Sequence, residues 1–274
     1  MIDLHLHTTA SDGRSTPREL VDYAARGGVS VMAVTDHDTT AAVSEVRSEA
    51  RARDIEAISG IEITAVENER DIHVLGYFFD PLHEPLAAFL AAQRANRIAR
   101  VEAIAARLAT LGVPVDVEAL VQEARRETGR SIGRPQVARA MVAAGHVADT
   151  REAFDRWLAR GGPGFVPRTG ARTEVVIDVI HQAGGIASLA HPGKVHVDDR
   201  IKPLQDAGLD AIEAFHPDHD TALVERYVEL ARSLNLLLTG GSDFHGDVSH
   251  GLNPGSVTLP AAEWERLRQA NASR

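Results

Sequence analysis

The sequence predicts an α/β fold, with a parallel sheet or barrel that is interrupted by a block of helices. Strand patterns alternate with helical patterns in residues 1–84, which is typical of βα units. Only helical patterns follow in residues 85–164, and the alternation resumes in residues 165–274. We therefore expect a barrel formed by 1–84 and 165–274, with 85–164 inserted as a helical subdomain that contributes to substrate binding.

Length and composition fit this architecture. The chain has 274 residues, which suits one large α/β domain or one domain with an insertion. An apolar fraction of 44% is enough for a sizeable core, and because only 4% of the residues are aromatic, we expect that core to be aliphatic. The sequence contains no cysteine, which excludes disulfides and thiolate metal sites and leaves His, Asp and Glu as metal ligands.

Charge and hydropathy restrict the compartment and the partners. No apolar run has the length of a membrane span, and the first expected strand begins at residue 2, so we expect no signal peptide and a cytoplasmic protein. The net charge of −10 argues against a broad surface for duplex DNA. A small phosphorylated substrate remains compatible, since bound metal ions supply positive charge locally.

The opening residues predict a short strand that carries two histidines. Side chains two residues apart in a strand point to the same face, so His5 and His7 project together. A divalent metal can accept one nitrogen from each imidazole. Asp12 follows in the next loop, and the three residues form a candidate metal-binding motif.

The next elements continue the alternation. Thr16 and Glu19 match a capping box around Pro17, and they predict a helix that ends at residues 27–28. Further elements are expected at residues 30–35 (strand), 40–53 (helix), 55–63 (strand) and 72–77 (strand). Polar residues lie at or just beyond the ends of these strands, which is the rim where barrels build their active sites.

Helices alone are expected in the central block. They cover residues 85–111, 117–127, 135–145 and 150–161, the last with Thr150 as its cap. No strand-like run separates them, which favours an inserted subdomain over ordinary barrel helices.

The alternation then resumes. Thr173 is expected to cap a helix. Strands are expected at residues 185–190, 209–215 and 236–240. His191 follows the first of them, His216 the second, and Asp243 and His245 the third.

Nine histidines and carboxylates therefore fall on one expected rim, although a random scatter would place many of them within helices. They are His5, His7, Asp12, His37, Glu62, His73, His191, Asp243 and His245. This concentration of ligand-type side chains indicates a metal-dependent active site.

The order and spacing of these residues resemble the polymerase and histidinol phosphatase (PHP) family of metal-dependent phosphoesterases. The matching motifs are His5-x-His7, Asp12-Gly13, Thr35-Asp36-His37, Gly60-x-Glu62, His73, Ala190-His191-Pro192 and Gly241-Ser242-Asp243-x-His245. The resemblance covers both ends of the chain and is greatest to the branch with a helical insertion. It implies a distorted barrel of seven β/α units and a centre of three divalent metal ions.

The resemblance also implies which residues bind each ion. A first ion would be bound by His5, His7, Glu62 and Asp243. Glu62 would bridge to a second ion, completed by His73 and His191. A third ion would be bound by Asp12, His37 and His245. Such ligands accept Mn, Fe and Zn, and the complete set favours an active enzyme.

This chemistry suits hydrolysis of a phosphate ester, because metals lower the pKa of water and neutralise phosphoryl oxygens. The resemblance implies removal of the 3′-phosphate from a 3′,5′-bisphosphonucleotide to leave a nucleoside 5′-monophosphate, and 5′→3′ exoribonuclease action on short RNA. Two alternatives stay open: a phosphatase of another metabolite such as histidinol phosphate, and a non-catalytic nucleotide-binding module. The metal, the nucleobase and the choice between a monomer and a small homo-oligomer also stay open.

Five further residues are candidates for substrate binding. Arg134 begins an expected helix, where its guanidinium and free N–H groups suit an anion; the alternative is a solvated surface arginine. Arg168 and Lys194 follow the helical block and the His191 loop, and His216 and His219 follow a rim strand. On the first helix of the block, we interpret the series Arg94, Arg97, Arg100 and Arg107 as a solvated face rather than a track for RNA.

Overall fold

A seven-stranded sheet lies at the centre of the part of the chain that the structure describes. This computed structural model describes residues 1–126, 129–246 and 252–274. The strands follow one another across the sheet in sequence order. They are β1 (Ile2–Leu6), β2 (Val31–Val34), β3 (Glu56–Glu67), β4 (Arg70–Tyr77), β5 (Ile186–Leu189), β6 (Ala211–Phe215) and β7 (Leu237–Gly240). Leu6, the last residue of β1, pairs with Phe244, which follows β7, so the sheet nearly closes into the expected distorted barrel.

The sheet is parallel except at β4, which departs from the parallel sheet or barrel that the strand–helix alternation predicts. β4 runs antiparallel to both of its neighbours, β3 and β5, whereas the other pairs are parallel. The cause is the connection, because only Asn68 and Glu69 separate β3 from β4, with φ angles of 49° and 61°. A two-residue turn joins antiparallel strands, whereas a parallel pair needs a much longer crossover.

This hairpin changes the position of two expected site residues. The sequence places Glu62 and His73 at strand ends, but the structure places both within strands, in β3 and β4. His73 pairs with Thr64 across the hairpin, and Thr64 shares a face with Glu62 because the two are two residues apart. Glu62 and His73 therefore project from the same face of the sheet.

The N-terminal ends of three helices test the caps expected from the sequence: one cap is confirmed and two are wrong. At α1 (Pro17–Arg26), the Thr16 hydroxyl accepts from the Glu19 N–H at 3.3 Å, and the Glu19 carboxylate accepts from the Thr16 N–H at 2.8 Å. The caps expected at Thr150 and Thr173 are wrong. The Asp149 carboxylate caps α6 (Thr150–Ala153) one residue earlier, and Thr173 is already the first residue of α7 (Thr173–Gln182).

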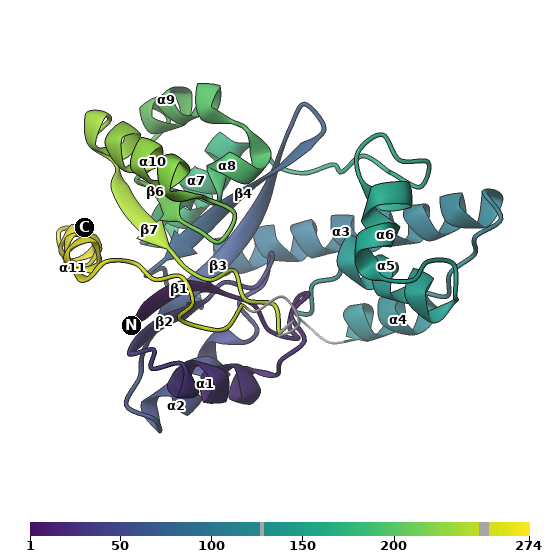
Figure 1. Cartoon of the computed structure of the whole chain (residues 1–274), viewed down its shortest axis with the longest axis horizontal. Coiled ribbons are helices and arrows are strands. Elements are labelled where there is room, and N and C mark those ends of the chain that lie inside the picture. Colours follow the sequence, from purple (N-terminus) through teal and green to yellow (C-terminus); the bar gives the residue numbers. More distant parts are fainter. Residues whose placement is uncertain (127–128, 247–251) are drawn as a thin grey trace.

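A lobe of helices stands beside the barrel, on the right in Figure 1, and we call it the helical lobe. It consists of α3 (Glu84–Thr110), α4 (Glu118–Arg126), α5 (Arg134–Ala143), α6 and the π-helical turn η1 (Phe154–Leu158). The expected end of α4 at Glu127 lies outside the described residues. No strand occurs between Glu84 and Leu158 in the described ranges.

The long helix α3 belongs to both parts of the molecule. Leu86 and Leu90, near its start, pack in the barrel core. Ile104 and Leu108, near its end, pack with Met141 in a hydrophobic cluster of the helical lobe. The middle of α3 therefore lies where barrel and lobe meet.

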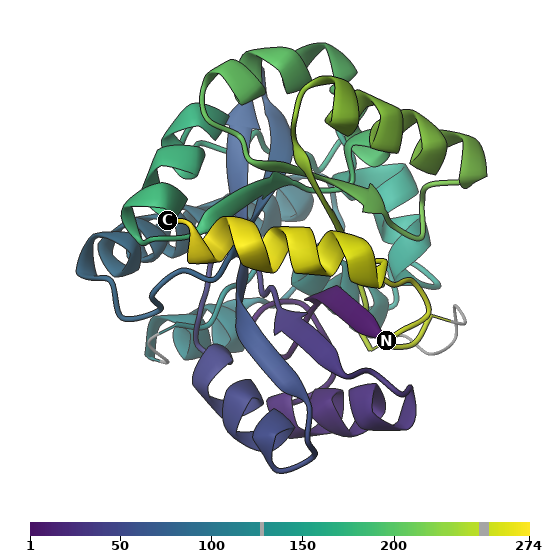
Figure 2. The ribbon, with the colours of Figure 1, turned by 90° about the vertical axis from the view of Figure 1, so that its left-hand side faces the viewer.

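The remaining helices cover the barrel. They are α2 (Val43–Arg51), α8 (Pro192–Val195), α9 (Asp198–Asp206), α10 (Thr221–Ser233) and α11 (Ala261–Ala272). α11 lies across the end of the barrel that faces away from the lobe (Figure 2), where Trp264 and Leu267 pack with Ile2 and Leu4. The core is mainly aliphatic, as the composition predicts. Within the described ranges, no helix is both long and apolar enough to cross a membrane.

Candidate metal centre and arginine cleft

Two histidines at the end of β1 begin the site. His5 and His7 project from one face, and both are fully buried. Nε2 of each ring lies 3.3 Å from Oε2 of Glu62 and 3.2 Å from Oδ1 of Asp243. Asp243 follows β7 and has a positive φ angle of 49°. The four side chains thus direct nitrogen and oxygen atoms toward one point, as the ligands of a divalent cation do.

The other carboxylate oxygen of Glu62 faces a second pair of histidines. Oε1 lies 2.7 Å from Nδ1 of His73 and 3.0 Å from Nε2 of His191. His73 comes from β4, and His191 follows β5. Because the two oxygens of Glu62 face different histidine pairs, this one residue can bridge two cations.

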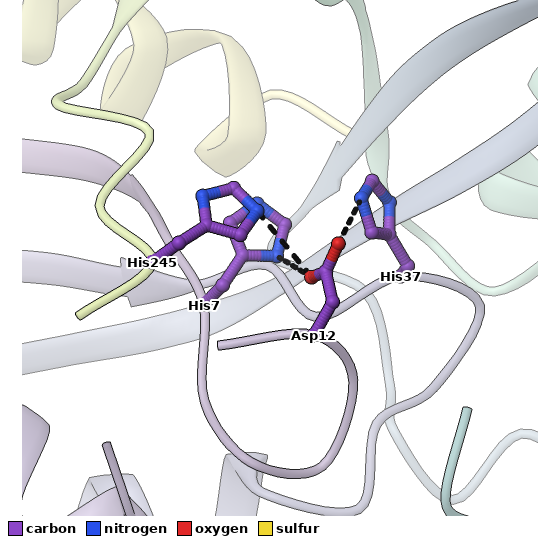
Figure 3. Close-up of side chains that lie close together, drawn as sticks. All are labelled: His7, Asp12, His37 and His245. Carbon is purple, nitrogen blue, oxygen red and sulfur yellow. Dashed lines mark ion pairs between the residues drawn. The ribbon is translucent and has the colours of Figure 1, made fainter. Parts of the chain in front are cut away.

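A third group surrounds Asp12, in the loop after β1 (Figure 3). Its Oδ1 lies 3.3 Å from Nε2 of His245 and 3.7 Å from Nδ1 of His7. Its Oδ2 lies 3.6 Å from Nε2 of His37. The structure therefore brings all nine expected ligand residues into three adjoining groups.

Several ring nitrogens in these groups are buried without a hydrogen-bond partner in the described part of the chain. They are both nitrogens of His7, Nδ1 of His37 and Nδ1 of His191. An unpaired buried polar atom costs about 1–3 kcal/mol, so such a concentration marks a place that a ligand completes. Imidazole and carboxylate donors are those that Zn, Mn and Fe accept, and the residues present therefore fit a divalent metal centre.

The charges of these groups also suit cations. Burial raises the pKa of Glu62, but the rings of His37 and His73 lower it more, so its pKa lies well below the usual range. The pKa of Asp12 is likewise raised by burial and then lowered well below its usual range by His37 and His245. Both carboxylates are therefore ionised at neutral pH and can bind a metal directly.

The histidines fall into two classes. Burial lowers the pKa of His37 to about 3 and that of His191 to about 4, against the opposing effect of Glu62, so these rings are neutral and offer a lone pair at pH 7. For His7, burial lowers the pKa, but close contacts with Asp243 and Glu62 raise it to about 10. A cation bound there must therefore displace a proton from His7.

A buried carboxylate beside the metal centre binds two arginines. Asp38 is fully buried, and its Oδ2 accepts from Nε of Arg97 at 2.5 Å and from Nη2 of Arg168 at 2.7 Å. Burial raises the pKa of Asp38, but these two guanidiniums lower it more, and its pKa lies below the usual range. Asp38 thus fixes one guanidinium from α3 and one from the segment after the helical lobe.

A second carboxylate binds two more arginines. Oδ2 of Asp71 accepts from Nη2 of Arg134 at 3.0 Å and from Nη1 of Arg100 at 3.3 Å. The ring centre of Phe165 lies 5.6 Å from Cζ of Arg100 and 5.9 Å from Cζ of Arg134, within cation–π distance. Arg134 is the first residue of α5, the position predicted from the sequence.

These four arginines line a cleft that continues from the metal centre. Asp12, His37 and His73 form one part of its wall, and the guanidiniums form another. The four guanidiniums outnumber by two the carboxylates that bind them, Asp38 and Asp71. Nε of Arg168 is buried and has no hydrogen-bond partner in the described residues. The cleft is therefore suited to an anion.

The cleft corrects the interpretation of the arginines on α3. Arg97 is buried, and Arg94 and Arg100 are half-buried, whereas only Arg107 of the four is exposed. A solvated face is therefore wrong for the first three. The reason is that α3 passes between barrel and lobe, so its polar face meets Asp38 and Asp71 instead of solvent.

Comparison with known proteins agrees with this geometry. The family model described as PHP domain matches residues 3–129. The 5′-3′ exoribonuclease Rnm of Salmonella typhimurium is 37% identical over 250 residues, which cover 89% of this chain and 84% of that protein. The chain belongs to the PHP family.

Other PHP relatives also act on phosphate esters. The 3′,5′-nucleoside bisphosphate phosphatase of Chromobacterium violaceum is 32% identical over 93% of this chain and 90% of that protein. The phosphoribosyl 1,2-cyclic phosphate 1,2-diphosphodiesterase of Eggerthella lenta is 34% identical over 89% of this chain and 94% of that protein. A solved structure from Bifidobacterium adolescentis, assigned as a metal-dependent phosphoesterase, has a TM-score of 0.86 and 32% identity. The match covers 97% of this chain and 94% of that chain. This PHP protein is a phosphoric ester hydrolase.

Two of the expected substrate residues of this PHP enzyme contact a candidate ligand. Nε2 of His216 and Nζ of Lys194 lie 3.2 Å and 3.6 Å from Oδ2 of Asp243, the oxygen that faces away from His5 and His7. His216 is buried, whereas Lys194 is partly exposed at the edge of the centre. His216 therefore positions Asp243, and Lys194 remains accessible to an anion.

His219 lies behind the His191 loop of the PHP site. Its Nδ1 donates to the Ala214 carbonyl at 2.9 Å, and its Nε2 accepts from the Gly193 N–H at 3.2 Å. Both ring nitrogens are thus occupied, which leaves none for a substrate in this arrangement.

Several residues that shape the PHP site were not predicted from the sequence. Asp38 and Asp71 each lie within two residues of a candidate ligand, and that proximity is the signal that could have found them. Asp36, by contrast, belongs to the motif recognised in the sequence; it accepts from Thr8 and Ser11 and so fixes the loop that carries Asp12. Glu213 is a lone carboxylate in the apolar strand β6, and a charged residue in such a strand is buried only with a partner.

Proposed function

We propose that this PHP enzyme binds three divalent metal ions, Mn, Fe or Zn, through the nine residues of the centre. The first ion is assigned to His5, His7, Glu62 and Asp243; the second to Glu62, His73 and His191; the third to Asp12, His37 and His245. The convergent donors and the unpaired buried nitrogens support this assignment. Once bound, the ions supply a water nucleophile of lowered pKa and neutralise the phosphoryl oxygens.

We further propose that the substrate is a 3′,5′-bisphosphonucleotide, which loses its 3′-phosphate to give a nucleoside 5′-monophosphate. The observation that carries this proposal is the arginine cleft, which adjoins the metal centre and contains four guanidiniums suited to a second phosphate. A substrate with two phosphates uses both sites at once. The relative from Chromobacterium violaceum, a 3′,5′-nucleoside bisphosphate phosphatase, supports the same choice.

In this proposal, the arginine cleft and the metal centre bind different phosphates of the substrate. Arg97, Arg100, Arg134 and Arg168 bind and orient the 5′-phosphate, because a guanidinium forms charge-assisted hydrogen bonds with phosphate oxygens. The metal ions that the centre would hold would neutralise the 3′-phosphate, and fixing both ends of the nucleotide aligns the ester bond for attack. Lys194, at the edge of the centre, can neutralise charge on the same phosphate.

Short RNA with a 5′-phosphate is a related substrate in this proposal. Its first nucleotide presents the same 5′-phosphate and the same 3′-oxygen–phosphorus bond as the bisphosphonucleotide, and cleavage of that bond releases a mononucleotide. The Salmonella relative is named a 5′-3′ exoribonuclease, which supports this extension. We propose a cytoplasmic location for this activity.

We also propose the division into a barrel, residues 1–84 and 165–274, and an inserted helical subdomain, residues 85–164. The separate hydrophobic cluster of the lobe supports it. The barrel carries all nine candidate metal ligands. The insertion carries Arg97, Arg100 and Arg134, so we assign it to substrate binding.

The test is phosphate or nucleotide release by the Mn-loaded protein from four substrates: adenosine 3′,5′-bisphosphate, AMP, histidinol phosphate and short 5′-phosphorylated RNA. We expect turnover of the bisphosphate and the RNA, and little of the two monophosphates, which cannot occupy both anion sites. Turnover of histidinol phosphate alone would disprove the proposed nucleotide substrate. Absence of turnover with bound metal would favour a nucleotide-binding role.

A further inference from the structure

A fully buried carboxylate on β6 contacts two candidate ligands at the same time. Glu213 has no exposed surface. Its Oε1 accepts from Nδ1 of His5 at 2.8 Å, and its Oε2 accepts from the backbone N–H of His191 at 2.9 Å. One N–H group comes from β1 and the other from the loop after β5, the strand next to β6.

The first contact decides which nitrogen His5 offers to a metal. A neutral imidazole carries one proton, and the carboxylate keeps it on Nδ1. Nε2 is then the nitrogen left for a metal, and it faces Glu62 and Asp243 at 3.3 and 3.2 Å. A carboxylate behind a histidine in this way fixes both the tautomer and the ring orientation of a metal ligand.

The second contact fixes a strained backbone. His191 has a φ angle of 28° and a ψ angle of 57°, a region that residues other than glycine rarely adopt. The hydrogen bond from its N–H to Glu213 helps to hold this conformation, and the conformation directs Nε2 of His191 to Oε1 of Glu62, 3.0 Å away.

We propose that Glu213 is a positioning residue that couples the first and second metal sites, through the ring of His5 and the backbone of His191. The third site is independent of it, because Glu213 forms no hydrogen bond or ion pair with Asp12, His37 or His245 in the described part of the chain. The inference rests on the proposed assignment of metal ligands and not on the identity of the substrate.

The variant Glu213→Gln isolates this role. Two N–H donors converge on Glu213, but an amide has only one acceptor oxygen, so glutamine satisfies one donor and turns its own NH2 toward the other. We expect the metal-free variant to keep the melting temperature of the wild type within a few degrees. We expect the affinity of two of its Mn sites to fall about 10- to 100-fold, while one site per chain keeps its affinity.

The measurement is Mn titration by calorimetry, with metal content after dialysis as a second readout. Ser188→Ala is the matched control, because Ser188 is equally buried in the barrel and its hydroxyl bonds that of Thr239 at 2.7 Å. Three sites of wild-type affinity in folded Glu213→Gln would overturn the proposal, as would an equal loss at all three. The second variant, Glu213→Asp, retains the charge, but its side chain is too short to reach both donors.

If neither Glu213→Gln nor Glu213→Asp folds, Glu213 is a folding residue and the proposal is wrong. Because the readout is metal binding, its outcome is separate from any failure of the proposed substrate.

Discussion

The Nε–H of Arg97 donates to Oδ2 of Asp38 at 2.5 Å, and this contact joins the helical lobe to the metal-binding rim of the barrel. Asp38 follows the candidate ligand His37, and Arg97 lies in the middle of α3. One buried carboxylate therefore fixes a guanidinium of the proposed anion site and adjoins a candidate ligand of the proposed metal centre. The relative position of the two sites depends on it.

Asp38→Asn should destabilise the protein by about 3–5 kcal/mol, because it leaves Arg97 and Arg168 buried without their counter-charge. Urea unfolding at pH 7 measures this change. Asp71→Asn is the control, since the Asp71 side chain is partly exposed at 16% and its removal should cost less. Equal stability of wild type and Asp38→Asn would show that the ion pair contributes nothing.

The same pair predicts a pH dependence. Two guanidiniums hold the pKa of Asp38 below its ordinary value in the folded state, so ionised Asp38 favours folding above the unfolded pKa of about 3.9. The stability difference between wild type and Asp38→Asn should be constant above about pH 5 and should shrink as the pH falls below 4. Unfolding curves from pH 2 to 7 test this, and a difference that is independent of pH would contradict it.

Metal affinity should rise with pH. The contacts of His7 with Asp243 and Glu62 raise its pKa to about 10, so a metal must displace at least one proton at every pH below that value. Between pH 6 and pH 8 the affinity should increase about tenfold per unit for each proton displaced. Proton release during Mn binding in weakly buffered solution measures the number directly, and binding without proton release would exclude a protonated His7.

Arg134→Ala should raise KM for the bisphosphonucleotide about 10- to 100-fold, because it removes one charge-assisted contact of about 1.5–3 kcal/mol. Metal content should stay unchanged. Arg107→Ala is the matched control, since Arg107 lies on α3 but is exposed. If Arg134→Ala lost metal instead, the guanidinium would belong to the metal centre.

His191→Ala should abolish turnover and lower the metal content by about one ion per chain, because His191 has one of the few nitrogens that face the second site. Metal analysis and phosphate release together test the assignment. His146→Ala, in the helical lobe, provides a histidine control. Full activity and full metal content in His191→Ala would disprove the ligand role.

Local rules predict those parts of the fold that short segments determine alone. Thr16 and Glu19 specify the start of α1 because a capping box needs only four residues, and His5 and His7 share a face because strand geometry requires it. The β3–β4 hairpin was not predictable by the same means. Its turn residues, Asn68 and Glu69, are not the Asn-Gly pair that usually signals two positive φ angles.

Residues whose role depends on tertiary neighbours were harder to predict. Arg97 and Arg100 carry the periodicity of an ordinary polar helix face, and only the position of α3 beside Asp38 and Asp71 makes them part of a site. Glu213 lies in an apolar strand, and no local pattern shows that an N–H of β1 and an N–H of the loop after β5 both donate to its carboxylate. Such residues become visible only when the barrel brings separate strands together.

The continuity of α3 has a consequence for the turnover cycle. This helix has 27 residues, contains no glycine, and has proline only in its first turn, so it lacks the usual causes of a kink. It is anchored in the barrel at one end and in the lobe at the other. We therefore expect the lobe not to close over the substrate as a lid, and we expect product to leave without waiting for a domain movement. Catalytic rates should then follow the chemistry or the dissociation of the nucleotide rather than a conformational gate.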